Sequence, residues 1–236
     1  MASIFDFGVA SVTAIALRKK VFAELEAAGF SPAKSLPLPD MDQRLRPAAE
    51  VSARLMALDA LFTWVAFLEN SVATARIQNY IDRNRLLDWL TEKESAIVTL
   101  SRNEARDLHV DNIGWKLENM WAFAWVLGFD QEPTLEASQI EEDVTRPLIY
   151  EFLPGLDATV DQLLAKSTPR STDDVIAMEY RFYCAHNAVR SAQLGGDTVP
   201  KGFHPLIHGG AVHERRHSLS WCLSPEVAWD ETDLST

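Results

Sequence analysis

The 236-residue sequence is poor in cysteine and in positive charge. Its two cysteines, Cys184 and Cys222, are too few for a disulfide framework, and both fall in expected helices, as is typical of buried thiols in a reducing compartment. Basic residues number 22 against 34 acidic ones, which gives a formal net charge of −12. Nucleic-acid affinity depends on neutralising phosphates, so an acidic chain without a basic run is not expected to bind nucleic acid.

The sequence also lacks an apolar run long enough to cross a bilayer. Its first apolar segment, residues 7–17, is too short to span one, and the basic Arg18-Lys19-Lys20 follows it. A secretory signal carries its basic residues before the apolar segment. We therefore expect a cytoplasmic protein that makes no contact with a membrane.

No segment alternates between apolar and polar residues as a strand does, whereas apolar residues recur every three or four positions in several segments. The expected helices cover residues 9–28, a stretch that starts near Pro47, residues 112–127 and residues 171–194. Between Leu55 and Leu68 the second helix has only Asp59 and Thr63 as polar residues, so it should be buried nearly all round. The predicted fold class is all-α.

We expect a single compact multi-helix domain with a buried central helix and short irregular connections. Residues 1–46 form an N-terminal helix and a proline-rich connector, residues 47–223 form the helical core, and residues 224–236 form a C-terminal tail. A helix that is apolar nearly all round is buried nearly all round, whereas the packing arrangement of the helices is not readable from the sequence.

One motif suggests chemistry. Residues 213–217 match H-E-x-x-H, in which His213 and His217 would bind zinc and Glu214 would act as general base. Against zinc, both intervening residues are arginines, and Arg215 flanks the apolar stripe of the helix, where it would repel a metal ion and seek a carboxylate. No third ligand follows at a fixed spacing, and His204 and His208 nearby favour adventitious metal binding at most.

Other signatures of catalysis are absent from the sequence. There is no G-x-S-x-G, no P-loop and no dinucleotide-binding glycine pattern, so we assign no catalytic residue and no cofactor. The acidic run Glu141-Glu142-Asp143 is typical of a solvated surface, because successive helical residues point in different directions. Glu118 lies beside Trp121 and Trp125, where an unpaired carboxylate would be costly, so it should have a partner.

The order of several segments resembles the bacterial family known as domain of unknown function 4272, over most of the chain. These segments are residues 22–30 (FAELEAAGF), 35–37 (SLP), 45–54 (LRPAAEVSAR), 115–118 (WKLE) with 125–128 (WVLG), 183–195, 214–221 (ERRHSLSW) and 229–232 (WDET). The resemblance includes Glu214 and Arg215 but not His213, which weakens a catalytic H-E-x-x-H. It implies no activity.

The resemblance groups Glu118, Arg190, Glu214 and Arg215 as recurring charged residues among aromatic ones. Clusters of charged residues can be either structural or functional. For these four we favour a structural ion-pair network between helices over a binding site. The leading functional hypothesis is a non-catalytic regulatory or interaction domain that binds another protein or a small ligand. The alternative is a hydrolase whose pocket is lined either by this charged network or by the histidines, and in the second case a metal would be bound through the His213, Glu214 and His217 pattern. The oligomeric state is left open.

Overall fold

A computed structural model describes residues 4–136 and 139–236, with side chains from residue 12 onward. Residues 7–11 of the first apolar segment are therefore described by their backbone alone. Within these ranges every regular element is a helix, so the predicted all-α class is confirmed. None of the helices in the described ranges has the length and apolar character that a membrane span requires.

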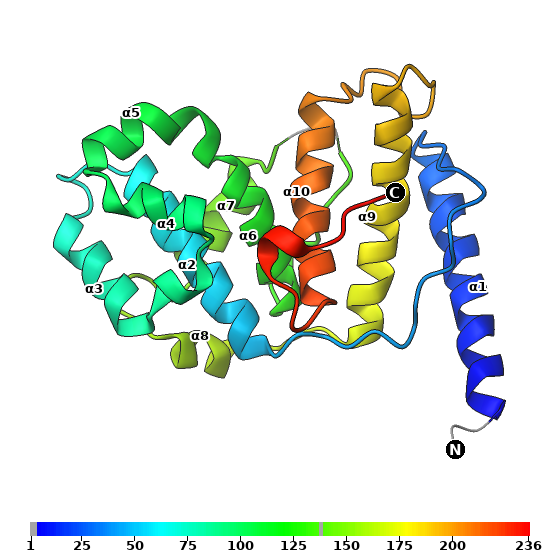
Figure 1. The fold of residues 1–236 in the computed structure, drawn as a ribbon, viewed down its shortest axis with the longest axis horizontal. Coiled ribbons are helices and arrows are strands. Elements are labelled where there is room, and N and C mark those ends of the chain that lie inside the picture. Colours follow the sequence, from blue (N-terminus) through cyan, green and yellow to red (C-terminus); the bar gives the residue numbers. More distant parts are fainter. Residues whose placement is uncertain (1–3, 137–138) are drawn as a thin grey trace.

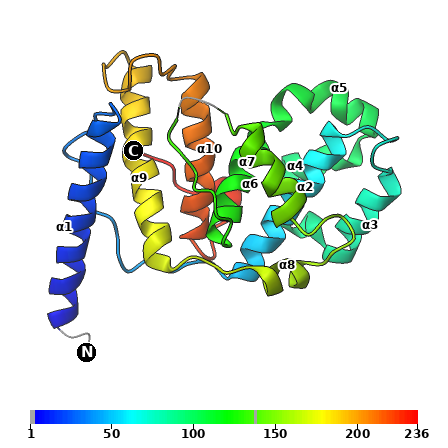
Figure 2. The ribbon, with the colours of Figure 1, turned by 180° about the vertical axis from the view of Figure 1, so that it is seen from behind.

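The elements follow one another in this order: α1 (Ile4–Ala27), α2 (Ala48–Ala66), α3 (Thr74–Asn84), η1 (Leu86–Trp89), α4 (Glu92–Thr99), α5 (Arg102–Ile113), α6 (Trp115–Val126), α7 (Glu142–Pro147), η2 (Leu148–Phe152), α8 (Val160–Lys166), α9 (Thr172–Gln193), α10 (Ile207–Cys222) and η3 (Trp229–Glu231). Helices α1, α9 and α10 stand side by side at one end of the molecule, and α3, α4 and α5 lie at the other (Figure 1). The view from behind shows α6 and α2 between the two groups (Figure 2).

Helix α2 is the predicted central helix. It packs against α3, α4, α5, α6, α8 and η1, and all of its residues from Val51 to Leu61 are buried. Burial on all sides is the expected result for a helix that is apolar nearly all round. Helix α10, which carries the H-E-x-x-H motif, packs between α6 and α9 and is also buried along most of its length.

One predicted helix boundary needs correction, and one stretch of short helices was not predicted. The helix expected from residue 112 begins at Trp115, because Asn112 still belongs to α5 and Gly114 joins the two helices with helical dihedral angles. Residues 74–111, for which no helix was predicted, contain three short helices and a 3-10 turn, and all four elements pack against α2. Ser101 and Glu104 form a capping box at the start of α5.

The connector between α1 and α2 runs past the end of α9 before it enters α2 (Figure 1). Arg18 of α1 donates to the carbonyl oxygens of Lys34 and Leu36, and the Tyr180 hydroxyl of α9 donates to Pro37 O over 2.9 Å. Side chains therefore satisfy a proline-rich backbone that has few amide donors of its own.

The tail after α10 returns across that helix toward α9 (Figure 1). Arg46, just before α2, donates to the carbonyls of Trp221, Ser224 and Val227, and Arg216 donates to those of Leu234 and Ser235. Arginines at both ends of the tail thus hold its backbone against the helices.

Candidate functional site

His217, the second histidine of the H-E-x-x-H motif, packs against the C-terminal tail. The His217 ring stacks on Trp229 with centroids 3.7 Å apart, and its Nε2 lies 3.0 Å from Trp229 O. A carbonyl oxygen only accepts, so Nε2 carries the proton and donates. Burial lowers the pKa of His217 to about 4, although this hydrogen bond acts in the opposite direction. The nitrogen that would face a metal is therefore already engaged with the tail.

The other members of the motif also have protein partners. The Glu214 Oε2 atom accepts from Asn119 Nδ2 over 3.0 Å, and the His213 ring lies edge-on to His186. Across the described part of the chain, no three or more His, Cys, Asp or Glu side chains are grouped so that they could hold a metal ion. His204 lies on the loop before α10 and contacts His208 in the first turn of that helix.

Glu118 and Arg215 form a buried ion pair between α6 and α10. The Arg215 Nε atom lies 2.7 Å from Glu118 Oε2, and the two side chains are 1% and 0% exposed. Arg215 also donates to Thr134 O over 2.6 Å, and Glu118 accepts the backbone N–H of Ile140 over 2.8 Å. The pair therefore joins two helices to the segment that follows α6.

The four residues grouped by sequence are placed in three different environments. Glu118 and Arg215 contact each other, Glu214 bonds to Asn119, and Arg190 lies exposed on α9 and donates to Gln193 Oε1 over 2.7 Å. The family resemblance groups Arg190 with residues of α10, but its guanidinium group bonds within α9.

A second buried charge cluster was not anticipated from sequence. Arg54 of α2 bonds to Glu94 of α4 through both Nη atoms, at 2.6 and 3.1 Å, and Lys116 lies 2.6 Å from the same carboxylate. Burial alone would raise the pKa of Glu94, but Arg54 and Lys116 lower it to about 2. The sequence places the cation Arg54 in the predicted central helix but does not indicate its partner.

Arg216 is a further buried charge that was not predicted from the sequence. It is 3% exposed, lies 3.3 Å from Glu179 Oε1 and bonds to His186 Nδ1 over 2.8 Å. Burial, followed by the adjacent Arg216, lowers the pKa of His186 to about 3. Neighbouring helical side chains point about 100° apart, so α10 buries both Arg215 and Arg216 because α6 covers one side and α9 the other.

Both cysteines are free and buried, as expected. Burial raises the pKa of the Cys184 thiol to about 12 and raises that of Cys222 as well. A thiol with a raised pKa is a poor nucleophile, because the thiolate is the reactive form.

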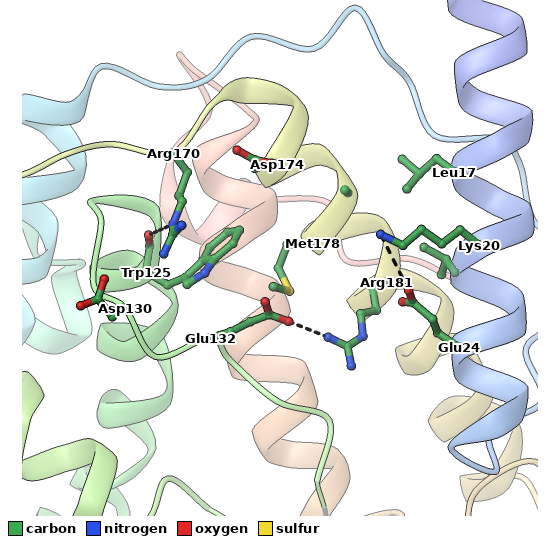
Figure 3. Close-up of a pocket in the computed structure, with 12 residues that line it drawn as sticks. Leu17, Lys20, Glu24, Trp125, Asp130, Glu132, Arg170, Asp174, Met178 and Arg181 are labelled. Carbon is green, nitrogen blue, oxygen red and sulfur yellow. Dashed lines mark hydrogen bonds and ion pairs between the residues drawn. The ribbon is translucent and has the colours of Figure 1, made fainter.

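A cleft of about 600 Å³ lies between α1 and α9 and is called the α1–α9 cleft here. Its floor consists of Leu17 and Val21 from α1, Ala177 and Met178 from α9, and Trp125 from α6. Its charged rim consists of Lys20, Glu24, Asp130, Glu132, Arg170, Asp174 and Arg181. Figure 3 shows these charges arranged around the apolar floor. The cleft was not predictable from sequence, because its three walls meet only after α1 packs on α9.

Two ion pairs lie on the rim in Figure 3. Lys20 and Glu24 pair along α1 at 3.8 Å, and Arg181 of α9 pairs with Glu132 at 2.9 Å. Arg170 lies over the Trp125 ring at 5.3 Å and donates to the Trp125 carbonyl. The cleft is thus lined by charges of both signs above an apolar surface.

Comparison with known proteins places the chain by family alone. The model of a family described as a domain of unknown function (DUF4272) matches residues 17–232. No curated protein and no solved structure matches the chain.

Proposed function

The chain belongs to the DUF4272 family, and we propose that it is a non-catalytic domain that binds another protein or a small ligand through the α1–α9 cleft. The observation that carries this proposal is the combination of an apolar floor and an ion-paired rim in a hollow of about 600 Å³. Ligand sites are concave, mostly apolar, and carry a few polar groups that fix orientation.

The charged side chains of the rim can exchange their ion-pair partners for those of a bound molecule. The Lys20 and Glu24 side chains are 73% and 45% exposed, and the Glu132 side chain is 56% exposed. Exposed ion pairs contribute about 0–1 kcal/mol, so a partner's charges can replace them at little cost. The floor then supplies the apolar contact area, and the rim selects partners with matching charges.

The groups that a catalytic role would need have structural roles instead, which supports a binding function. The Glu214 carboxylate and the His217 imidazole are both bonded to protein groups, and the pKa of His217 is lowered by burial. Activated nucleophiles and bases have pKa values shifted toward neutrality and lie in clefts. The α1–α9 cleft is lined by none of these groups.

Site-specific photocrosslinking tests the proposal. A benzoylphenylalanine placed at Lys20 points into the cleft from an exposed position, and crosslinking in the protein's own host cells captures what occupies it. The matched control places the same group at Leu108, which is 65% exposed on α5 at the far end of the molecule. We expect a defined adduct mass from position 20 alone.

Blocking the floor supplies the second arm. Ala177→Arg extends a charged side chain from α9 into the cleft and is expected to abolish the adduct while the fold is retained by circular dichroism. Identical adducts from positions 20 and 108, or an adduct that Ala177→Arg leaves unchanged, would contradict binding at this cleft.

A further inference from the structure

Two histidines organise the turn that leads from α9 into α10. The imidazole Nδ1 of His204 accepts the backbone N–H groups of Leu206 and Ile207, both over 3.3 Å, and Nδ1 of His208 accepts the N–H of His204 over 2.8 Å. The first N–H groups of a helix have no acceptor within the helix. The His204 side chain supplies that acceptor at the start of α10, where the N-cap residue Leu206 has no polar side chain.

These contacts fix the protonation state of both rings. A backbone N–H group can only donate, so each Nδ1 must present a lone pair and each ring must carry its proton on Nε2. A second proton would have to bind at Nδ1, and it would remove the acceptor. At His204 and at His208, protonation and capping therefore exclude each other.

The charges around the turn do not favour an imidazolium ion in place. The first turn of α10 contains no acidic residue and carries the positive end of the helix dipole. Helix α9 presents Gln193 and, bonded to it, the cation Arg190, and α6 meets the turn through the uncharged Trp115. The loop carries Asp197 and Lys201, both exposed. In the part of the chain that the structure describes, no imidazole forms an ion pair with a carboxylate.

The same turn holds the end of α1. The Phe203 ring packs edge-on against His208 and against Phe30, with ring centroids 5.3 Å apart in both pairs. The backbone N–H of Ser31 donates to Thr198 O over 2.9 Å. Figure 1 shows the end of α1 beside the loop between α9 and α10. A change in this turn is therefore passed directly to α1.

We propose that the turn between α9 and α10 is a pH-sensitive latch, which neutral His204 and His208 keep closed and which opens when they are protonated. Opening frees the first N–H groups of α10 and separates Phe203 from Phe30, so the end of α1 loses its seat. Helix α1 is one wall of the α1–α9 cleft, but the latch does not depend on what that cleft binds.

Amide hydrogen exchange of the full chain, resolved by nuclear magnetic resonance and corrected for the intrinsic effect of pH, tests the proposal. Measurements at pH 7.5 and 5 lie on either side of the usual titration range of imidazole. We expect the protection of the Leu206 and Ile207 amides to fall at least about fivefold at pH 5, because each loses its acceptor. The Ser31 amide should lose protection with them.

Three variants show which histidine is responsible. His204→Asn keeps a capping acceptor that does not titrate, so it should keep the Leu206 and Ile207 amides protected at both pH values. His109→Asn, on α5 at the far end of the molecule, should show the same loss as the wild type. His217→Phe should also show it, which separates the latch from the packing of the C-terminal tail.

A measurement on the unmodified chain guards against a misfolded variant. The long-range ¹H–¹⁵N spectrum of the imidazole rings at pH 7.5 should show the Nε2–H tautomer at His204 and His208. The proposal is overturned by the Nδ1–H tautomer at these residues, by Leu206 and Ile207 amides that are equally protected at both pH values, or by an equal loss in His204→Asn and the wild type.

Discussion

Arg215 of α10 and Glu118 of α6 share a 2.7 Å ion pair in which neither side chain is reached by solvent. Removal of one partner leaves a buried, uncompensated charge, which typically costs about 3–5 kcal/mol. We therefore expect Arg215→Ala to lower the free energy of unfolding by about this amount in urea denaturation. The control is Arg181→Ala, whose partner Glu132 is 56% exposed and which should cost less than about 1 kcal/mol.

The double variant Arg215→Met with Glu118→Leu separates charge from packing. Replacing both partners with apolar residues of similar volume is often neutral, so the double variant should be more stable than Arg215→Ala. Arg215→Ala protein with the melting behaviour of the wild type would refute the structural role of the pair.

Asp59 is expected to destabilise the protein at high pH. Burial raises its pKa to about 7, against the hydrogen bond from Tyr80, which lowers it. The carboxyl group binds its proton more tightly in the folded state, so its contribution to stability is complete below about pH 4 and is lost as the pH rises to 7. Asp59→Asn should therefore be more stable than the wild type at pH 8, by up to about 4 kcal/mol at 1.4 kcal/mol per pKa unit.

Urea denaturation at pH 4, 6 and 8 measures this difference, which should shrink toward pH 4. Asp111→Asn, at an exposed position on α5, serves as the control and should leave the pH dependence unchanged. If Asp59→Asn and the wild type share one pH profile, Asp59 does not ionise differently on folding.

His217 has the opposite pH dependence. Its pKa is lowered from 6.5 to about 4, chiefly by burial, so its contribution to stability is complete above pH 6.5 and is lost as the pH falls toward 4. Between pH 6.5 and 5 the wild type should lose up to about 2 kcal/mol through this group. His217→Phe keeps the stacking on Trp229 but not the titration, so its stability should fall less over this range. His109→Phe, on α5, is the control.

Metal analysis tests the remaining zinc hypothesis. Because His217 Nε2 donates to Trp229 O, we expect untagged protein to contain zinc well below one equivalent by plasma mass spectrometry. His213→Ala should leave that content unchanged. Stoichiometric zinc that His213→Ala removes would instead support a metal-dependent hydrolase.

Two glycines with positive φ offer a matched comparison. Gly128 has φ +108°, and a Cβ there would lie 2.5 Å from Thr168 O, whereas Gly155 has φ +80° and open space around it. Both alanine variants carry backbone strain, but only Gly128→Ala must also move the segment that pairs with the end of α6. We expect it to be less stable than Gly155→Ala by about 1–3 kcal/mol in thermal unfolding. Equal melting temperatures would contradict this.

The burial or pairing of a residue was predictable where it follows from the sequence of its own helix. The apolar circumference of residues 55–68 predicted the burial of α2, and the indoles beside Glu118 predicted that its carboxylate would be paired. The buried positions of Arg54 and Arg216 were not predictable, because each lies on a helix face that is covered by an element distant in sequence. The same limit applies to the α1–α9 cleft, whose walls come from three or more segments.

The contacts of Arg46 set a condition on how this chain folds. This side chain lies at the start of α2 and donates to the carbonyl of Trp221, 175 residues later. Contacts of such separation slow folding relative to helical bundles built from neighbours, since a long loop must close before they form. During synthesis the core therefore stays open at this seam until α10 and the segment after it have left the ribosome, and Arg46, Arg215 and Arg216 remain solvated until that late step.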